Sequence, residues 1–125
     1  MFKKHFDSYV IAGDSITCEL AGFTFKAKLV QDTDVRPKEF DCYTPKQIQA
    51  WKDDKWHYFG IVLSASYNGI DCGDHLASLW GIEGNFPSRR KNPNKYFLEV
   101  ANELLPEALK EAQKELEKLR QALAA

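Results

Sequence analysis

The chain has 125 residues, of which 44% are hydrophobic and 28% charged, and its 17 basic and 18 acidic residues give a formal net charge of -1. This composition predicts one folded domain over residues 1–125 and excludes intrinsic disorder, which combines low hydrophobicity with high net charge. The near neutrality also gives no whole-chain attraction for nucleic acid or an anionic membrane.

The N-terminal stretch does not have the pattern of a signal peptide, because His5, Asp7 and Ser8 interrupt its apolar residues. No apolar run approaches the roughly 18 residues that a transmembrane helix needs. These two observations predict a cytoplasmic protein.

A first β-hairpin is predicted around Ala21-Gly22, which separates residues 15–20 from residues 23–31. The second of these segments, FTFKAKLVQ, alternates apolar and polar residues with the period of a half-buried strand. The hairpin is therefore expected to have one face in water.

Residues 32–43 are polar and acidic and contain Pro37, which indicates a loop. Its position makes it a candidate functional loop. Thr44 followed by Pro45 then resembles an N-cap and a first helical residue, and predicts a short helix that ends at about Lys52.

The segment from Trp56 to Glu83 contains two β-rich runs, and Asn68-Gly69 favours a tight type I′ turn after the first. We interpret it as a second hairpin at the centre of the fold. The residues expected to supply most of the apolar packing of the sheet are Trp56, Tyr58, Ile61, Leu63, Leu79, Trp80 and Ile82.

A long helix is predicted over residues 95–123, where apolar residues recur with a period near 3.6. Pro106 is expected to kink or break it. At about 43 Å, such a helix is longer than a strand of about 27 Å and overhangs the sheet. Leu116, Leu119 and Leu123 then need to be covered by residues 2–11, by a second copy of the chain in a homodimer, or by a partner protein.

These elements define an α+β fold. We expect an antiparallel sheet of about four strands in two hairpins, a short middle helix, and a long C-terminal helix packed on one face.

One set of residues could carry metal or nucleophilic chemistry, because Cys, His and carboxylates bind zinc and form Cys-His pairs. The set comprises Cys42, His57, Asp71, Cys72, Asp74 and His75. Their spacing matches no recognisable site, so we predict that the protein is not an enzyme, that it has no metal site and no cofactor, and that Cys18, Cys42 and Cys72 are free thiols.

A basic loop offers the alternative function of nucleic-acid binding, through Arg89, Arg90, Lys91 and Lys95. Cations flanked by the aromatic residues Phe86 and Tyr96 could hold phosphates and stack bases. A solvated loop before a helix is the competing interpretation, and the net charge favours it.

Protein binding is the leading interpretation. The predicted C-terminal helix carries a stripe of glutamates at every fourth position as well as a leucine seam, and the 32–43 loop adds charged residues of its own. The predicted partner-binding residues are Glu103, Glu107, Glu111, Leu116, Leu119, Leu123, Arg36 and Glu39.

Three blocks of the sequence, WHYFGIV from Trp56, LASLWGIE from Leu76 and YFLEVANEL from Tyr96, resemble small proteins of unknown function carried by bacteriophages, prophages and plasmids. The resemblance covers roughly residues 32–109 and carries no active-site residue. It implies a mobile-element accessory protein in the cytoplasm of a bacterial host, acting on a host or phage protein. One form of such activity is inhibition of a host defence system, of the anti-CRISPR or anti-restriction type.

Overall fold

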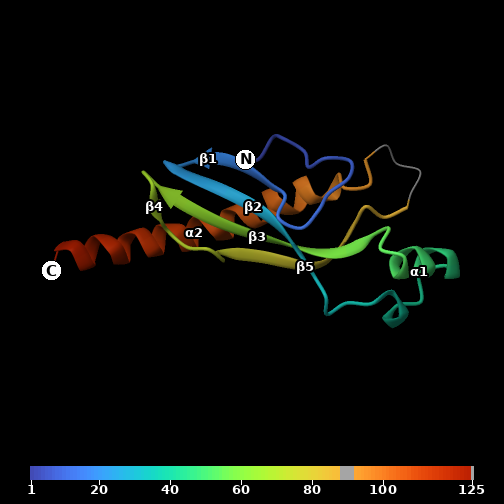
Figure 1. Cartoon of the computed structure of the whole chain (residues 1–125). Coiled ribbons are helices and arrows are strands. Elements are labelled where there is room, and N and C mark those ends of the chain that lie inside the picture. The colour runs from blue at the N-terminus through green and yellow to red at the C-terminus, as the bar shows by residue number, and fades with distance from the viewer. Residues whose placement is uncertain (88–91, 125) are drawn as a thin grey trace.

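The computed structural model describes residues 1–87 and 92–124 and shows an α+β fold (Figure 1). The antiparallel sheet contains β1 (Ser15–Leu20), β2 (Phe23–Gln31), β3 (His57–Tyr67), β4 (Ile70–Asp71) and β5 (Ala77–Gly84). Its order is β1-β2-β3, and both β4 and β5 pair with the remaining side of β3. The helices are η1 (Pro37–Glu39), α1 (Pro45–Lys52) and α2 (Tyr96–Ala124). This architecture confirms the predicted fold class.

Both predicted tight turns are present. Ala21 and Gly22 between β1 and β2 have φ angles of 53° and 85°, and Asn68 and Gly69 between β3 and β4 have φ angles of 48° and 79°. Two successive residues with positive φ match the twist of the flanking strands, which is why Asn-Gly favours such turns. The second β-rich run begins with the two-residue strand β4 and continues as β5 only after an intervening loop.

The short helix α1 begins where its cap predicted. The Thr44 hydroxyl accepts a hydrogen bond from the backbone N–H of Gln47 at 3.2 Å, and the Gln47 side chain accepts one from the N–H of Thr44 at 2.9 Å. This reciprocal pair satisfies two backbone donors that a helix start leaves without partners. Trp56 connects α1 to the sheet, because its indole N–H donates to the carbonyl of Gln47 at 2.9 Å.

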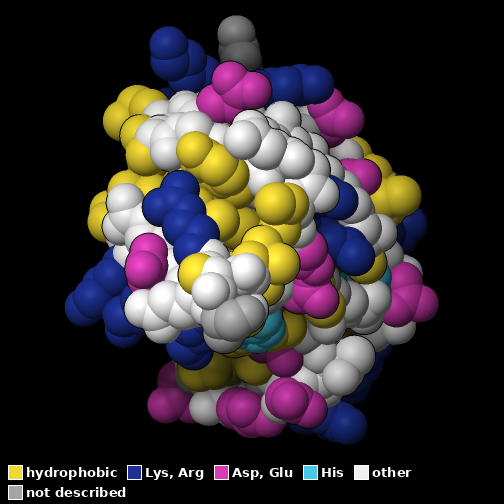
Figure 2. All heavy atoms as spheres, turned by 90° about the vertical axis from the view of Figure 1, so that its left-hand side faces the viewer, with side chains coloured by type: hydrophobic (Ala, Val, Ile, Leu, Met, Phe, Trp, Pro, Cys, Tyr) yellow, Lys and Arg dark blue, Asp and Glu magenta, His cyan; other side chains and the backbone are white. Residues whose placement is uncertain are grey.

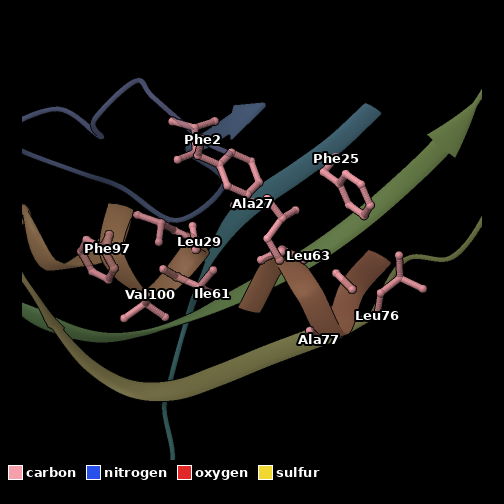
Figure 3. Close-up of a cluster of buried hydrophobic side chains, with 14 of the residues drawn as sticks. Phe2, Phe25, Ala27, Leu29, Ile61, Leu63, Leu76, Ala77, Phe97 and Val100 are labelled. Carbon is pink, nitrogen blue, oxygen red and sulfur yellow. The ribbon is translucent and has the colours of Figure 1, made fainter. Parts of the chain in front are cut away.

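The main hydrophobic core lies between α2 and the face of the sheet that we call the inner face (Figure 3). Alternate residues of β2 and β3 point into it, and they meet Phe97 and Val100 of α2. The strand residues, all fully buried, are Phe25, Ala27, Leu29, Ile61 and Leu63. The alternation of apolar and polar residues in FTFKAKLVQ therefore does correspond to a buried face and a solvent-exposed face of β2.

Helix α2 continues through Pro106, so the break that is one of the two sequence-based expectations at this residue does not occur. Pro106 is exposed, so its ring lies on the solvent side of the helix. Leu105 and Ala108 on either side of it are buried against the sheet. Tertiary packing of this face offsets the cost of the proline, about 3 kcal/mol in an isolated helix.

The N-terminal segment, residues 2–10, packs against the first half of α2. Phe2, Phe6 and Val10 are buried, and the Phe6 ring lies 5.8 Å from that of Phe97. One of the three predicted covers for Leu116, Leu119 and Leu123 is thereby ruled out, because this segment lies near residues 97–102 instead.

Asparagine side chains hold the N-terminal segment in place. Asn102 accepts from the N–H of Phe2 at 2.7 Å and donates to its carbonyl at 3.0 Å, and Asn85 binds the N–H and carbonyl of Val10, both at 2.8 Å. Asn94, only 1% exposed, donates to carbonyls of the segment at 3.0 and 3.1 Å. We call these three residues the asparagine clamp. They replace the backbone partners that a neighbouring strand would supply.

Two residues assigned to the core from the sequence are not buried. Leu79 is 41% exposed and Trp80 is 44% exposed. In the described part of the chain β5 pairs with β3 alone, so Leu79 faces inward at the margin of the sheet, opposite Ile61. Trp80 lies on the opposite, outer face, above Gly60. Among the described residues, no helix has the length and apolar character needed to cross a membrane.

Candidate functional site

A second group of aromatic side chains covers one end of the outer face. Tyr58 of β3 points outward and meets Trp56 and Tyr43, with ring centroids 5.2 Å apart for Tyr58–Trp56 and 5.4 Å for Tyr43–Trp56. Phe86 and Phe40 pack at its edges. This aromatic cluster fixes the end of the 32–43 loop and the start of α1 on the sheet.

An open groove of about 480 Å³ lies beside this cluster, between the 40–43 segment and β5. Its rim includes Phe40, Trp80 and Tyr96, which are 47%, 44% and 47% exposed. Tyr43, Tyr58 and Glu83 lie deeper and are buried or half-buried. The other lining residues are Cys42, Leu79, Gly81, Ile82 and Pro93. We call this hollow the aromatic groove.

A short chain of hydrogen bonds crosses the groove. The Tyr58 hydroxyl donates to the Tyr43 hydroxyl at 3.0 Å, and the Tyr43 hydroxyl donates to a carboxylate oxygen of Glu83. The antiparallel register explains this arrangement, because Tyr58 and Glu83 are directly opposite each other on β3 and β5.

Ionisation of both tyrosines is disfavoured. Burial, followed by its hydrogen bonds to Glu83 and Tyr58, raises the pKa of Tyr43 far above the ordinary tyrosine value. Burial also raises the pKa of Tyr58, and the negative charges of Glu83 and Glu39 add to the effect. Both phenols therefore remain neutral hydrogen-bond donors at physiological pH.

Trp80 is held in one orientation by its neighbours. Its ring lies so close above Gly60 that a Cβ at this position would be 2.2 Å from ring carbon Cε3. Its indole N–H donates to Ser78 Oγ at 3.2 Å, and His75 stacks beside it at 6.5 Å. His75 Nε2 lies 2.9 Å from the same Ser78 oxygen. We interpret the serine and histidine as supports for the tryptophan.

The second candidate surface is the end of α2. Every side chain from Glu117 to Ala124 is exposed, whereas Ala112 is buried and Leu116 packs partly against the core. Figure 1 shows these last turns projecting beyond the sheet, and Figure 2, viewed from that side, shows hydrophobic side chains gathered there. Leu119 and Leu123 are 37% and 85% exposed. We call residues 117–124 the α2 end.

The residues predicted to bind a partner do not form one surface. Glu103 and Glu107 are exposed along α2, and Glu111 is half-buried and pairs with Lys114 at 3.3 Å. Arg36 and Glu39 are exposed at and beside η1, at the opposite end of the molecule from the α2 end (Figure 1).

The residues considered for metal or cysteine chemistry are also dispersed. Cys72 is buried and Cys42 is exposed in the aromatic groove, and these two and the half-buried Cys18 are free. Burial raises the pKa of the Cys72 thiol and of the Cys18 thiol. Within residues 1–87 and 92–124, no three His, Cys, Asp or Glu side chains are grouped as a metal site.

Three of the four predicted nucleic-acid contacts, Arg89, Arg90 and Lys91, lie outside the described residues. The fourth, Lys95, is exposed just before α2.

The aromatic groove was not predicted from the sequence. Its residues come from four separate parts of the chain, and the sequence pattern assigns four of them, Tyr58, Leu79, Trp80 and Ile82, to the core. A local signal was present: Gly60 and Gly81 lie inside strand patterns, where glycine often marks a bulge. The ladder between β3 and β5 is in fact irregular at that point, and the N–H of Gly81 donates to Asp32 at 3.0 Å.

Comparisons of the chain with protein-family models, with curated proteins and with solved structures found no match.

Proposed function

We propose that this protein is a non-enzymatic protein-interaction domain that binds a helix of a partner protein through its α2 end. The observation that carries the proposal is the exposure of Leu119 and Leu123 on the helix beyond the sheet. Isolated helical turns of this length are marginal in water, and exposed leucines at a projecting end favour association.

The spacing of the seam supports a helical partner. Leu109, Ala112, Leu116, Leu119 and Leu123 are separated alternately by three and four residues, the spacing of the contact positions in a helix pair. The first three contribute to the internal core and the last two continue the same stripe outward. A partner helix would extend an interface that already exists within the chain.

The charge of α2 indicates what should flank the partner's apolar stripe. The helix contains six glutamates against three lysines and one arginine, so its formal charge is -6 + 4 = -2. Glu115, four residues before Leu119, is half-buried beside the seam. We therefore propose an amphipathic helix with Lys or Arg beside its apolar residues. Inhibition of a host defence protein is one form of this function, and it rests on the resemblance to mobile-element proteins.

The test compares two double variants of the full chain. Leu119→Glu with Leu123→Glu places charges on the proposed contact, while Gln113→Glu with Gln121→Glu adds the same charges at exposed positions off the leucine seam. All four sites are exposed, so both variants should retain the thermal stability of the wild type. Each protein is immobilised and used to capture proteins from a bacterial lysate.

We expect wild type and the glutamine control to capture the same protein and the leucine variant to lose it. Light scattering of the purified proteins tests whether a second copy of the chain binds the α2 end instead. If the wild type is a dimer and the leucine substitutions dissociate it, the partner is a second copy. Equal capture by all three proteins, with no change in oligomeric state, would refute binding through the α2 end.

A further inference from the structure

The side chains that line the aromatic groove favour a ligand that carries a positive charge. Of the described residues that line it, Glu83 is the one with a carboxyl group and none is Lys, Arg or His; the rest are aromatic, aliphatic, glycine, proline or cysteine. Phe40, Trp80 and Tyr96 form its exposed rim. Aromatic faces with a carboxylate are the surroundings in which proteins bind organic cations.

We propose that the aromatic groove binds the cationic side chain, lysine or arginine, of a polypeptide, with Trp80 and Tyr96 contacting the cation and Glu83 neutralising it. This site is separate from the α2 end, and the inference does not depend on binding there.

The position of Glu83 argues against a neutral or anionic ligand. One oxygen of its carboxylate accepts the Tyr43 hydroxyl, and the group is half-buried in the groove. A neutral ligand that filled the groove would remove water from the carboxylate without replacing its interactions, which is costly. An anion would add repulsion. A cation replaces the lost hydration, and its contact with aromatic rings strengthens as water is excluded.

The surroundings of the groove add negative potential. The carboxylate of Glu39 is close enough to Tyr58 to raise the pKa of that phenol, as Glu83 also does. On the other side of Trp80 a second hollow of about 350 Å³ is lined by Asp32 and Asp34. The indole therefore borders two hollows that each contain a carboxylate, and carboxylates attract a positively charged side chain.

The site is also preorganised. Trp80 is fixed by its packing on Gly60 and by its bond to Ser78, and Glu83 is fixed by Tyr43, which Tyr58 orients in turn. A site in which aromatic and charged groups are already oriented loses less entropy on binding.

The experiment uses NMR titration of the full chain and follows the indole N–H signal of Trp80, which is assigned by its loss in Trp80→Phe. The signal of the buried Trp56 is the internal control. The probes are the N-acetyl methylamides of arginine, lysine and norleucine, the last being an uncharged side chain of similar length.

We expect saturable shifts of the Trp80 signal with the two cationic probes and much weaker shifts with norleucine. Glu83→Gln keeps an oxygen that can accept the Tyr43 hydroxyl but removes the charge, and should weaken cation binding by about 2- to 5-fold. Tyr96→Leu should also weaken it, whereas Glu99→Gln, at an exposed position of α2 outside the groove, should not.

Equal affinity for norleucine and lysine would overturn the proposal and identify the groove as an unselective apolar surface. Cation binding that Glu83→Gln leaves unchanged would overturn it as well, as would the absence of any shift with all three probes. A failure here leaves binding at the α2 end untouched, because none of these probes or variants involves Leu119 or Leu123.

Discussion

Replacing Gly84 by alanine tests the packing between β5 and α2. A Cβ at this position would lie 2.3 Å from ring carbon Cδ2 of Phe59 and 3.3 Å from Cζ of Phe97. Both rings are buried and in contact, with centroids 6.0 Å apart, so neither can move without disturbing the core. Overpacking of this kind costs about 1–3 kcal/mol, and we expect Gly84→Ala to reach or exceed the upper value.

Gly60→Ala is the matched comparison on the outer face. Its Cβ would also come too close to a ring, 2.2 Å from Cε3 of Trp80. Trp80, however, is 44% exposed, so a methyl group at residue 60 would displace its ring toward solvent without moving a buried side chain. We expect Gly60→Ala to lower the free energy of unfolding by about 1 kcal/mol or less, because only the contacts of an exposed ring are lost. The same substitution should abolish cation binding in the aromatic groove.

Urea unfolding of the two variants and the wild type measures both free energies. The expected order places the cost of Gly84→Ala well above that of Gly60→Ala. If Gly60→Ala proves as costly as Gly84→Ala, the distinction between a closed inner core and an open outer face is wrong. A cost below about 0.5 kcal/mol for Gly84→Ala would show that Phe59 and Phe97 are not tightly packed against β5.

Three further outcomes are expected. Asn94→Asp keeps the side-chain volume but removes the N–H donors that hold residues 2–10, so it should cost about 1–3 kcal/mol in urea unfolding and speed hydrogen exchange in that segment; unchanged exchange would contradict the role of the clamp. The pKa of Tyr43 is higher in the folded than in the unfolded state, so the unfolded chain loses its proton first and stability falls as pH rises above about 10. Urea unfolding measured from neutral to high pH should show a smaller fall in the free energy of unfolding for Tyr43→Phe than for the wild type. An identical fall in the two proteins would mean that this phenol is not buried. Leu79→Ala should cost about 1 kcal/mol or less against about 2–5 for the fully buried Leu63→Ala, and equal losses would restore the sequence-based assignment of Leu79 to the core.

The elements that were predicted correctly have local signals. Asn68-Gly69 favours a particular pair of backbone angles, and Thr44 with Gln47 satisfies the first backbone donors of α1 whatever the rest of the chain does. The alternation of apolar and polar residues in β2 likewise indicates which residues of that strand are buried and which are exposed. These features depend on neighbours in sequence, and a single sequence displays them.

The incorrect predictions depend on neighbours in space. Whether Leu79 is covered depends on β5 being at the margin of the sheet, and Trp80 faces outward because the ladder is irregular near Gly60. Pro106 remains within a helix because the buried residues on either side of it hold α2 on the sheet. The aromatic groove brings together segments that are tens of residues apart, so no pattern within a short window could indicate it.

The asparagine clamp has a consequence for the order of folding. Phe2 and Val10 precede their partners Asn102 and Asn85 by 100 and 75 residues. During synthesis, residues 2–10 leave the ribosome before these partners, and they can dock only after β5 and the start of α2 have been made. Contacts with so large a sequence separation form slowly because the intervening loop must close first. Residues 2–10 should therefore become ordered after the later-synthesised β5 and α2, and their phenylalanines stay exposed to chaperones until then.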